Sequence, residues 1–205
     1  MPTFCNNVGM TVNESNTLVY GLMRTRDLES QGWNRVAIGT MVARGQLIRL
    51  GRGLYASPDY MPSENSSIAQ VAIKNPKAVF CLLTALRLHG VTTQNPHEVW
   101  IAIDHKAKAP KMDYPPLRII RATGDAMSQG MEQMAVDGVV QVPVTVLAKT
   151  IADCFKFRNK IGLDVAIEAL KEAWQAKRVG MDELLHYAQI CRVQNVMRPY
   201  METLV

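Results

Sequence analysis

The segment from Thr25 to Ala56 constrains the fold more than any other part of the chain. It reads TRDLESQGWNRVAIGTMVARGQLIRLGRGLYA. Its first residue can cap a short helix that runs through Ser30, and Gly32 then breaks that helix. Asn34 can cap a second helix, which begins at Arg35 and ends about Arg44, just before a glycine. Two helices joined by so short a glycine turn predict a helix-turn-helix.

The second predicted helix has two different faces. At 100° per residue one side is apolar and is expected to face the core: Ala37, Ile38, Met41 and Val42. The opposite side carries small residues: Val36, Gly39, Thr40 and Ala43. Small side chains allow the backbone to come close to the floor of a DNA groove, where methyls and a hydroxyl can contact base edges. The alternative interpretation is that this small face packs against another helix.

A predicted hairpin follows the second helix. Gln46 to Leu50 favours a strand, Gly51-Arg52-Gly53 a tight turn, and Leu54 to Ala56 the returning strand. An arginine between two glycines is well placed for a phosphate or a minor groove. The hairpin would therefore be the wing of a winged helix-turn-helix.

Arginine dominates the charge of this region. From Arg24 to Ala56 six arginines stand against two acidic residues, a surplus of four in a chain whose net charge is +5. The guanidinium group can donate two hydrogen bonds at once to phosphate or guanine. The predicted DNA-contacting residues are Arg24, Arg26, Asn34, Arg35, Val36, Gly39, Thr40, Ala43, Arg44, Arg49 and Arg52.

The composition and the prolines divide the chain into parts. Hydrophobic content of 48% and charged content of 20% are ordinary for a soluble globular protein. We expect a flexible leader over residues 1–14, a DNA-binding domain over 15–57, a linker over 58–64 and a C-terminal domain over 65–205. A helix from Glu14 to Met23 is expected at the start of the DNA-binding domain. No secretory signal and no apolar run of membrane-spanning length is visible.

The C-terminal domain reads as mixed α/β, so the fold class is α+β with a small sheet and a helical end. The expected strands are Glu98–Asp104, Leu117–Ala122, Met131–Gln133 and Asp137–Val142. The expected helices are Ile68–Lys74, Ala78–His89, Val146–Phe157 capped by Thr145, Val165–Arg178, Asp182–Cys191 and a short one after Asn195. His89 would interact with the end of its own helix.

The chain offers little chemistry for an enzyme. Its four cysteines are far apart, which is typical of a reducing cytoplasm and predicts neither disulfides nor zinc. Four scattered histidines and the lack of a phosphate-binding glycine motif predict no catalytic residue, metal or cofactor. Lys149, Asp153 and Lys156 form one polar helix stripe, whose ordinary interpretation is a solvated face. Three lysines at positions 106, 108 and 111 form either a solvated turn or a second phosphate contact.

Two stretches resemble a known family. They are ARGQLIRLGRGLYASPD and VPVTVLAKTIADCFKFRNKIGLDVAIEAL, and in this order they are similar to AbiE-type abortive-infection antitoxins. The resemblance implies a transcriptional regulator of a type IV toxin–antitoxin system, active in phage defence. Its winged helix would bind inverted repeats in its own promoter and repress it. Its C-terminal domain would oppose a cognate nucleotidyltransferase toxin, directly or indirectly, through Lys149, Thr150, Asp153, Lys156, Phe157 and Arg158.

We therefore expect a cytoplasmic autorepressor and antitoxin that works without a cofactor. One winged helix makes few contacts, so a monomer or weak dimer that binds paired half-sites cooperatively is expected. Three alternatives remain open: an orphan regulator without a toxin, an enzyme that modifies its toxin, and a winged helix that binds protein instead of DNA.

Overall fold

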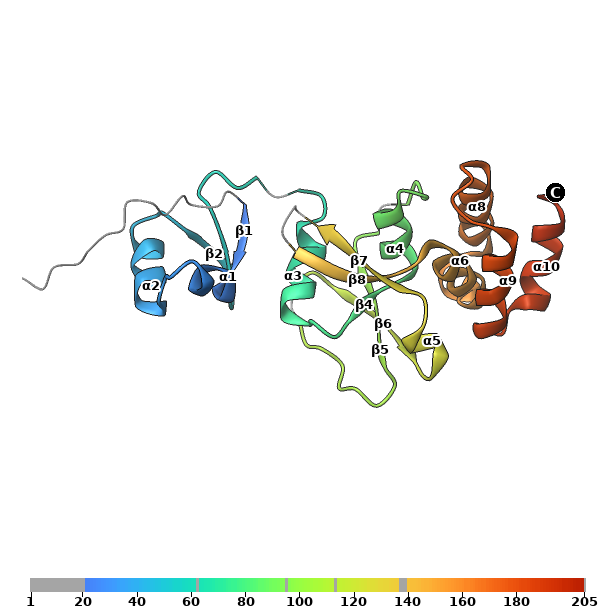
Figure 1. Ribbon diagram of the computed structural model, residues 1–205, viewed down its shortest axis with the longest axis horizontal. Helices are drawn as coiled ribbons and strands as arrows, with labels where there is room; N and C mark the ends of the chain where they lie inside the picture. Colours follow the sequence, from blue (N-terminus) through green and yellow to red (C-terminus); the bar gives the residue numbers. More distant parts are fainter. Residues whose placement is uncertain (1–20, 62, 95, 113, 137–139, 205) are drawn as a thin grey trace, which may run out of the picture. The chain divides into compact units, whose positions relative to one another are not determined.

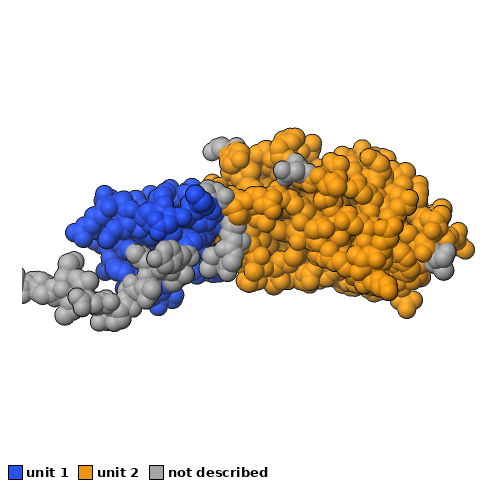
Figure 2. All heavy atoms as spheres, turned by 90° about the horizontal axis from the view of Figure 1, so that it is seen from above, with its two compact units in different colours: residues 1–61 blue, residues 62–205 orange. Residues whose placement is uncertain are grey.

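The computed structural model describes residues 21–61, 63–94, 96–112, 114–136 and 140–204. The chain divides into two compact units, Met1–Met61 and Pro62–Val205, which Figure 2 colours separately. Both units mix helices with a small sheet, and the C-terminal end is helical (Figure 1). The expected leader over residues 1–14 lies outside the described residues. Within them, no helix is both long and apolar enough to cross a bilayer.

Unit 1 contains the two predicted helices and the predicted hairpin. Its elements are β1 (Leu22–Arg24), α1 (Thr25–Ser30), α2 (Arg35–Ala43), β2 (Ile48–Gly51) and β3 (Leu54–Ala56). The sheet has the order β1-β3-β2, and both pairings are antiparallel. A five-residue core joins these elements: Met23, Leu28, Ile38, Met41 and Leu47. Each fully buried side chain of this kind contributes about 1.5–3 kcal/mol to the stability of such a small unit.

The predicted helix from Glu14 to Met23 is wrong at its C-terminal end. Leu22 and Met23 belong to β1, where they pair with Ala56 and Tyr55 of β3. Both are 2% exposed, and Met23 belongs to the core of unit 1. Pairing with β3 satisfies the backbone groups on the otherwise free side of β1, and this tertiary contact overrides the local helical pattern. Residues 14–20 lie outside the described residues.

Unit 2 is built on a mixed five-stranded sheet with the order β6-β5-β4-β8-β7. The strands are β4 (Val79–Phe80), β5 (Val99–Asp104), β6 (Leu117–Ala122), β7 (Met131–Val136) and β8 (Val140–Thr145). β5 is parallel to β6 and β4 is parallel to β8, whereas the other two pairings are antiparallel.

Helices cover this sheet and extend beyond it. They are α3 (Ser66–Lys74), α4 (Leu82–His89), α5 (Asp125–Ser128), α6 (Leu147–Lys156), α7 (Arg158–Ile161), α8 (Leu163–Gln175), α9 (Met181–Ile190) and α10 (Gln194–Glu202). α3 packs against β5, β7 and β8, and α4 packs against β5 and α6. α6 also contacts α8, α9 and α10, which lie at the end of unit 2 away from the sheet (Figure 1). α6 is therefore the central helix of unit 2.

Two predictions for unit 2 need correction. The apolar run from Ala78 to His89 is not one helix, because Val79 and Phe80 form the central strand β4 and α4 begins at Leu82. A buried strand and a buried helix share the same apolar composition, so periodicity could not separate them. Thr145 does not cap the following helix either, since it ends β8 and the N-cap residue is Val146. The first three residues of the predicted strand Asp137–Val142 lie outside the described residues, and the described strand there is β8, Val140–Thr145.

Candidate functional site

The exposed face of α2 is the first candidate surface. Asn34 caps the helix as predicted, since its Oδ1 accepts a hydrogen bond from the backbone N–H of Ala37 at 2.8 Å. Ile38 and Met41 anchor the helix in the core of unit 1. On the other side all four small residues are exposed, with Val36 at 79%: Val36, Gly39, Thr40 and Ala43. No part of residues 21–61, the described part of unit 1, covers this face.

Gly39 and Thr40 sit at the middle of this face. A Cβ atom added at Gly39 would meet no heavy atom within 4 Å, so packing within unit 1 does not require a glycine there. Thr40 Oγ1 donates to the carbonyl of Val36 at 3.0 Å. Its lone pairs are therefore left to accept from a partner, while its hydrogen is used within the helix.

An arginine-lined pocket of about 430 Å³ lies beside the start of α2. We name it the arginine pocket. Four arginines line it, one each from α1, α2, β2 and the hairpin turn: Arg26, Arg35, Arg49 and Arg52. The acidic group among the lining residues is Glu29, whose Oε1 lies 3.2 Å from Arg35 Nε. The pocket therefore keeps a surplus of positive charge, which suits a phosphate group.

Backbone and side-chain hydrogen bonds position the residues around the arginine pocket. The backbone N–H of Thr25 donates to the carbonyl of Gly53 at 3.1 Å, which ties the start of α1 to the hairpin turn. Thr25 was predicted as the N-cap of α1, but the N-cap residue is Arg24. The Asp27 carboxylate accepts from the backbone N–H of Arg24 at 3.0 Å and from its Nε at 2.9 Å.

Arg24 therefore has a structural partner within unit 1. Burial alone would raise the pKa of Asp27, but the hydrogen bonds and the charge of Arg24, with that of Arg26, hold this pKa below its usual value. Arg44, at the C-terminal end of α2, is exposed and lies outside the residues that line the pocket. Of the six predicted arginines, four are thus brought together.

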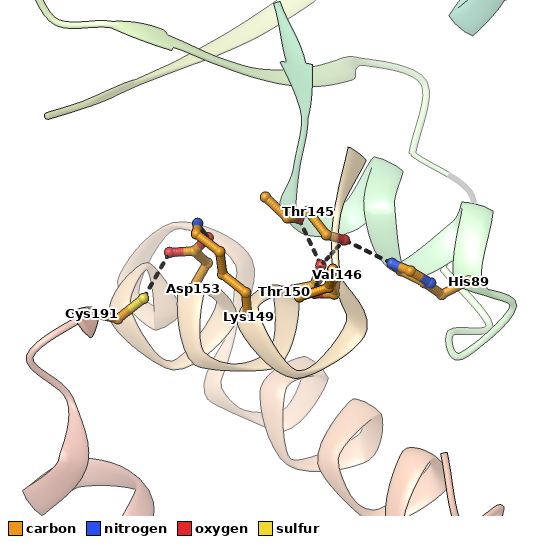
Figure 3. A network of polar contacts seen from close by, with 7 residues as sticks. All are labelled: His89, Thr145, Val146, Lys149, Thr150, Asp153 and Cys191. Atoms are coloured by element: carbon orange, nitrogen blue, oxygen red, sulfur yellow. Dashed lines mark hydrogen bonds and ion pairs between the residues drawn. The ribbon is translucent and has the colours of Figure 1, made fainter. Parts of the chain in front are cut away.

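The second candidate region is centred on α6, where the predicted polar stripe is mostly buried. Lys149 Nζ lies 2.6 Å from Asp153 Oδ2, and the two residues are only 3% and 7% exposed. Cys191 Sγ on the neighbouring chain segment donates to the other carboxylate oxygen, Asp153 Oδ1, at 3.2 Å (Figure 3). The solvated-face interpretation is wrong for this pair, because α4, α8, α9 and α10 surround α6.

A second set of polar contacts links α6 to the sheet. Thr150 Oγ1 lies 2.9 Å from the carbonyl of Thr145 and 2.7 Å from its hydroxyl (Figure 3). His89 Nε2 donates to the same Thr145 carbonyl at 2.8 Å. The predicted interaction of His89 with its own helix is replaced by this contact, and Arg178 Nη1 binds the His89 carbonyl instead. These contacts hold α4, β8 and α6 together.

Gly130 and Tyr187 complete the surroundings of Lys149, and the sequence did not reveal them. A Cβ atom at Gly130 would lie 2.6 Å from Lys149 Cδ and 2.7 Å from Tyr187 Cε1. The lysine stem and the tyrosine ring therefore both approach Gly130, whose φ is +67°, more closely than a Cβ atom would allow. An isolated glycine between strands gives no signal of such a contact until its neighbours in space are known.

The C-terminal end of α6 is the exposed part of the same motif. Lys156 is exposed and Phe157 is half-buried. Lys156 Nζ and Lys160 Nζ lie 5.9 Å and 5.6 Å from the centre of the Phe157 ring. Arg158 Nη1 donates to the carbonyl of Phe155 at 2.9 Å. We name this group, Lys156, Phe157, Arg158 and Lys160, the Phe157 corner.

The six predicted antitoxin residues therefore fall into two groups. Lys149, Thr150 and Asp153 are buried, whereas Lys156, Phe157 and Arg158 reach the surface at the Phe157 corner. Among the described residues, no three His, Cys, Asp or Glu side chains are grouped so that they could hold a metal ion.

The buried cysteines are expected to resist alkylation while the protein is folded. Burial, reinforced by the charge of Asp153, raises the pKa of Cys191 to about 12 and raises those of Cys81 and Cys154 as well. Only the thiolate reacts with iodoacetamide. At pH 8 these three thiols should stay unlabelled in the native protein and react fully in 6–8 M urea, as mass spectrometry of peptides can show. Rapid native labelling of Cys191 would contradict its burial against Asp153.

Comparisons with known proteins agree with this geometry in unit 1. Residues 18–58 match a family model described as a transcriptional regulator, AbiEi antitoxin. No curated protein sequence matches the chain. The chain is similar in fold to the crystal structure of the RV2827C protein from Mycobacterium tuberculosis, with a TM-score of 0.53 and 13% identity. That similarity covers 82% of this chain and 66% of the mycobacterial protein, so the chain spans just under two thirds of that protein's length.

The family match falls on the helices, the hairpin and the arginine pocket. It confirms, for this part of the chain, the resemblance that the sequence predicted. Over residues 18–58 the chain is therefore similar to the transcriptional regulators of the AbiEi antitoxin family.

Proposed function

We propose that unit 1 is a winged helix-turn-helix that binds double-stranded DNA and represses the promoter of its own gene. In this proposal α2 enters the major groove with its small-residue face toward the bases. The arginine pocket, next to the N-terminal end of α2, takes backbone phosphates. The observation that carries the proposal is this combination of an unpacked small face and four convergent arginines in one unit.

The charge of unit 1 favours DNA over a protein partner. The arginine pocket has one acidic lining residue for four arginines, and Arg35 keeps 85% of its side chain exposed. Protein interfaces place aromatic and apolar anchors at their centre, whereas the centre of this surface holds Gly39, Thr40 and Ala43. A polyanion with a groove fits both features.

A single winged helix makes few contacts, so cooperative binding of a monomer or weak dimer to paired inverted repeats is part of the proposal.

We further propose that unit 2 opposes a cognate nucleotidyltransferase toxin in the cytoplasm, and that the Phe157 corner is the surface it uses. Lys149, Thr150 and Asp153 are too buried to be touched by another protein. Lys156 and Lys160 flank an accessible aromatic ring, which suits an acidic patch with an apolar centre. Their buried neighbours would support this surface by fixing α6.

The experiment that tests the DNA proposal is a gel shift with the DNA immediately upstream of the reading frame and a scrambled duplex as competitor. Specific, salt-sensitive retardation is the expected result. If no shift occurs at low salt, unit 1 does not bind its promoter, and a protein-binding role for the helix-turn-helix becomes the better interpretation.

Arginine substitutions in the pocket should change the salt dependence of binding. Arg52→Ala and Arg26→Ala are each expected to reduce the slope of log K against log[salt] by about one, because each removes one phosphate contact. Fluorescence anisotropy at four or five salt concentrations measures the slope. Arg198→Ala is the matched control, since Arg198 is a 73% exposed arginine in unit 2. Unchanged slopes in both pocket variants would show that the pocket does not hold phosphates.

Charge reversal at the Phe157 corner should separate the two proposed activities. Lys156→Glu with Lys160→Glu is expected to abolish rescue of cells that express the toxin, because it repels an acidic partner, while promoter repression is unchanged. Lys171→Glu, at another exposed lysine of unit 2, is the control. Full rescue by the double variant would rule out this corner, and the absence of any toxin to rescue from would favour an orphan regulator.

A further inference from the structure

A second positively charged pocket lies in unit 2, far along the chain from the arginine pocket. It has a volume of about 430 Å³ and lies at the carboxyl end of β5, beside the C-terminal end of α3. β5 and β6 are parallel, so their carboxyl ends meet at the same edge of the sheet. Loops at this edge of parallel strands are a common place for small ligands.

Three lysines surround the opening of this pocket: Lys74, Lys77 and Lys108. All three are exposed, and none of them forms an ion pair within the described part of the chain. The carboxylate among the lining residues is Asp104, whose Oδ1 accepts from the backbone N–H of Lys106 at 2.8 Å. The opening therefore carries a surplus of positive charge.

The interior of the pocket is apolar. Its lining side chains include Pro76, Ala78, Ile103, Ala107, Pro110 and Met127. Ala78, just before β4, and Ile103, in β5, are buried, and they form the apolar floor of the pocket. The volume falls within the roughly 300–1,000 Å³ that is usual for pockets of small organic ligands. A ligand that fits both parts has a flat apolar body and an anionic end.

The loop that forms one wall is held in place by hydrogen bonds. Arg121 Nη1, on β6, donates to the carbonyls of His105 at 2.7 Å and Ala107 at 2.8 Å. The backbone N–H of Ala107 donates to the carbonyl of Asp104 at 2.9 Å. At the other wall, Asn75 Nδ2 donates to the backbone carbonyl of Val71, in the last turn of α3, and to Met112 Sδ, both at 3.3 Å. These hydrogen bonds fix both walls of the pocket.

We infer that this lysine pocket binds a nucleotide. The lysines hold the phosphate groups, the base lies against Ile103 and Met127, and Asp104 and Asn75 supply hydrogen-bonding groups near the sugar or base. The same chemistry is offered by a free nucleotide and by one nucleotide of a single strand. All of these residues belong to unit 2, so the inference does not depend on DNA binding by unit 1.

Isothermal titration of the full chain with ATP, GTP, CTP and UTP, and with a short single-stranded oligonucleotide, tests the inference. Saturable binding of a nucleoside triphosphate or of the oligonucleotide is expected, and the tighter of the two identifies the source. Inorganic triphosphate is the comparison that isolates the base. Equal affinity for triphosphate and for every nucleotide would overturn the inference, because it leaves no role for the apolar floor.

Nucleotide titrations of variants of the lysine pocket provide a second test of the inference. Lys77→Ala with Lys108→Ala is expected to weaken binding by about a hundredfold, since a hydrogen bond to a charged group contributes about a factor of ten. Ala107→Glu, which places a carboxylate at the opening and leaves the backbone bonds of residue 107 in place, should weaken it as much. Lys171→Ala is the matched control. Equal binding by the wild type and both pocket variants, or no binding of any nucleotide by the wild type, would overturn the inference while leaving the promoter gel shift unaffected.

Discussion

Replacing Asp153 with alanine is expected to lower the free energy of unfolding of unit 2 by about 3–5 kcal/mol. The substitution leaves the ammonium group of Lys149 without its carboxylate at a position where its side chain is only 4% exposed. It also removes the acceptor of the Cys191 thiol. Urea denaturation followed by circular dichroism measures the change, because unit 2 contains most of the helices.

A double variant separates the buried charge from the packing of α6. Lys149→Met with Asp153→Leu removes both charges and keeps similar volumes, so it should recover most of the stability lost by Asp153→Ala. If Asp153→Ala lowers the free energy of unfolding by less than about 1 kcal/mol, the Lys149–Asp153 pair is as well hydrated as a surface salt bridge, and the buried geometry is incorrect.

The burial of Lys149 and Asp153 decides how substitutions in the KTIADCFKFRNKIG segment should be interpreted. A variant of Lys149 or Asp153 that fails to protect against a toxin can fail because unit 2 has lost stability. A variant of Lys156 or Lys160 is expected to keep this stability, because both side chains are exposed and form no ion pair among the described residues. Thermal melting of each variant beside its protection assay therefore distinguishes support of the surface from the surface itself.

The sequence predicted best those features of the structure that depend on residues close to one another in the chain. Asn34 accepts the bond from Ala37 that an N-cap residue accepts, and Ile38 and Met41 are buried as their 100° spacing required. β6 has the predicted bounds, Leu117–Ala122. The family resemblance over residues 18–58 also depends on this local pattern.

The errors share a different cause, which is contact between distant parts of the chain. Leu22 and Met23 form a strand because they pair with β3, which lies 30 or more residues later in the chain. Val79 and Phe80 form a strand because β5 and β8 pair with them on either side. Lys149 and Asp153 have the i, i+4 spacing of a surface pair, and only the helices around α6 make them a buried one. No periodicity in a single segment contains that information.

The contribution of α2 to DNA binding can be tested at one residue. Gly39→Glu is expected to reduce affinity for the upstream DNA by a hundredfold or more, because it places a carboxylate on the face that meets the groove, where like charges cost several kcal/mol. The folded state should be unaffected, since a Cβ atom at Gly39 meets no heavy atom within 4 Å and the side chain can extend into solvent.

Gly39→Ala is the control that makes this result specific. Alanine adds only a methyl group and favours the helix by about 0.5–1 kcal/mol, so this variant should melt slightly higher and bind DNA nearly as well as the wild type. Anisotropy titrations and thermal melts of both variants give the two quantities. Loss of binding by Gly39→Glu with an unchanged melting temperature requires that α2 approaches the DNA through this face. Normal binding by Gly39→Glu would place the DNA on another side of unit 1, and the arginine pocket would then have to act without the small-residue face.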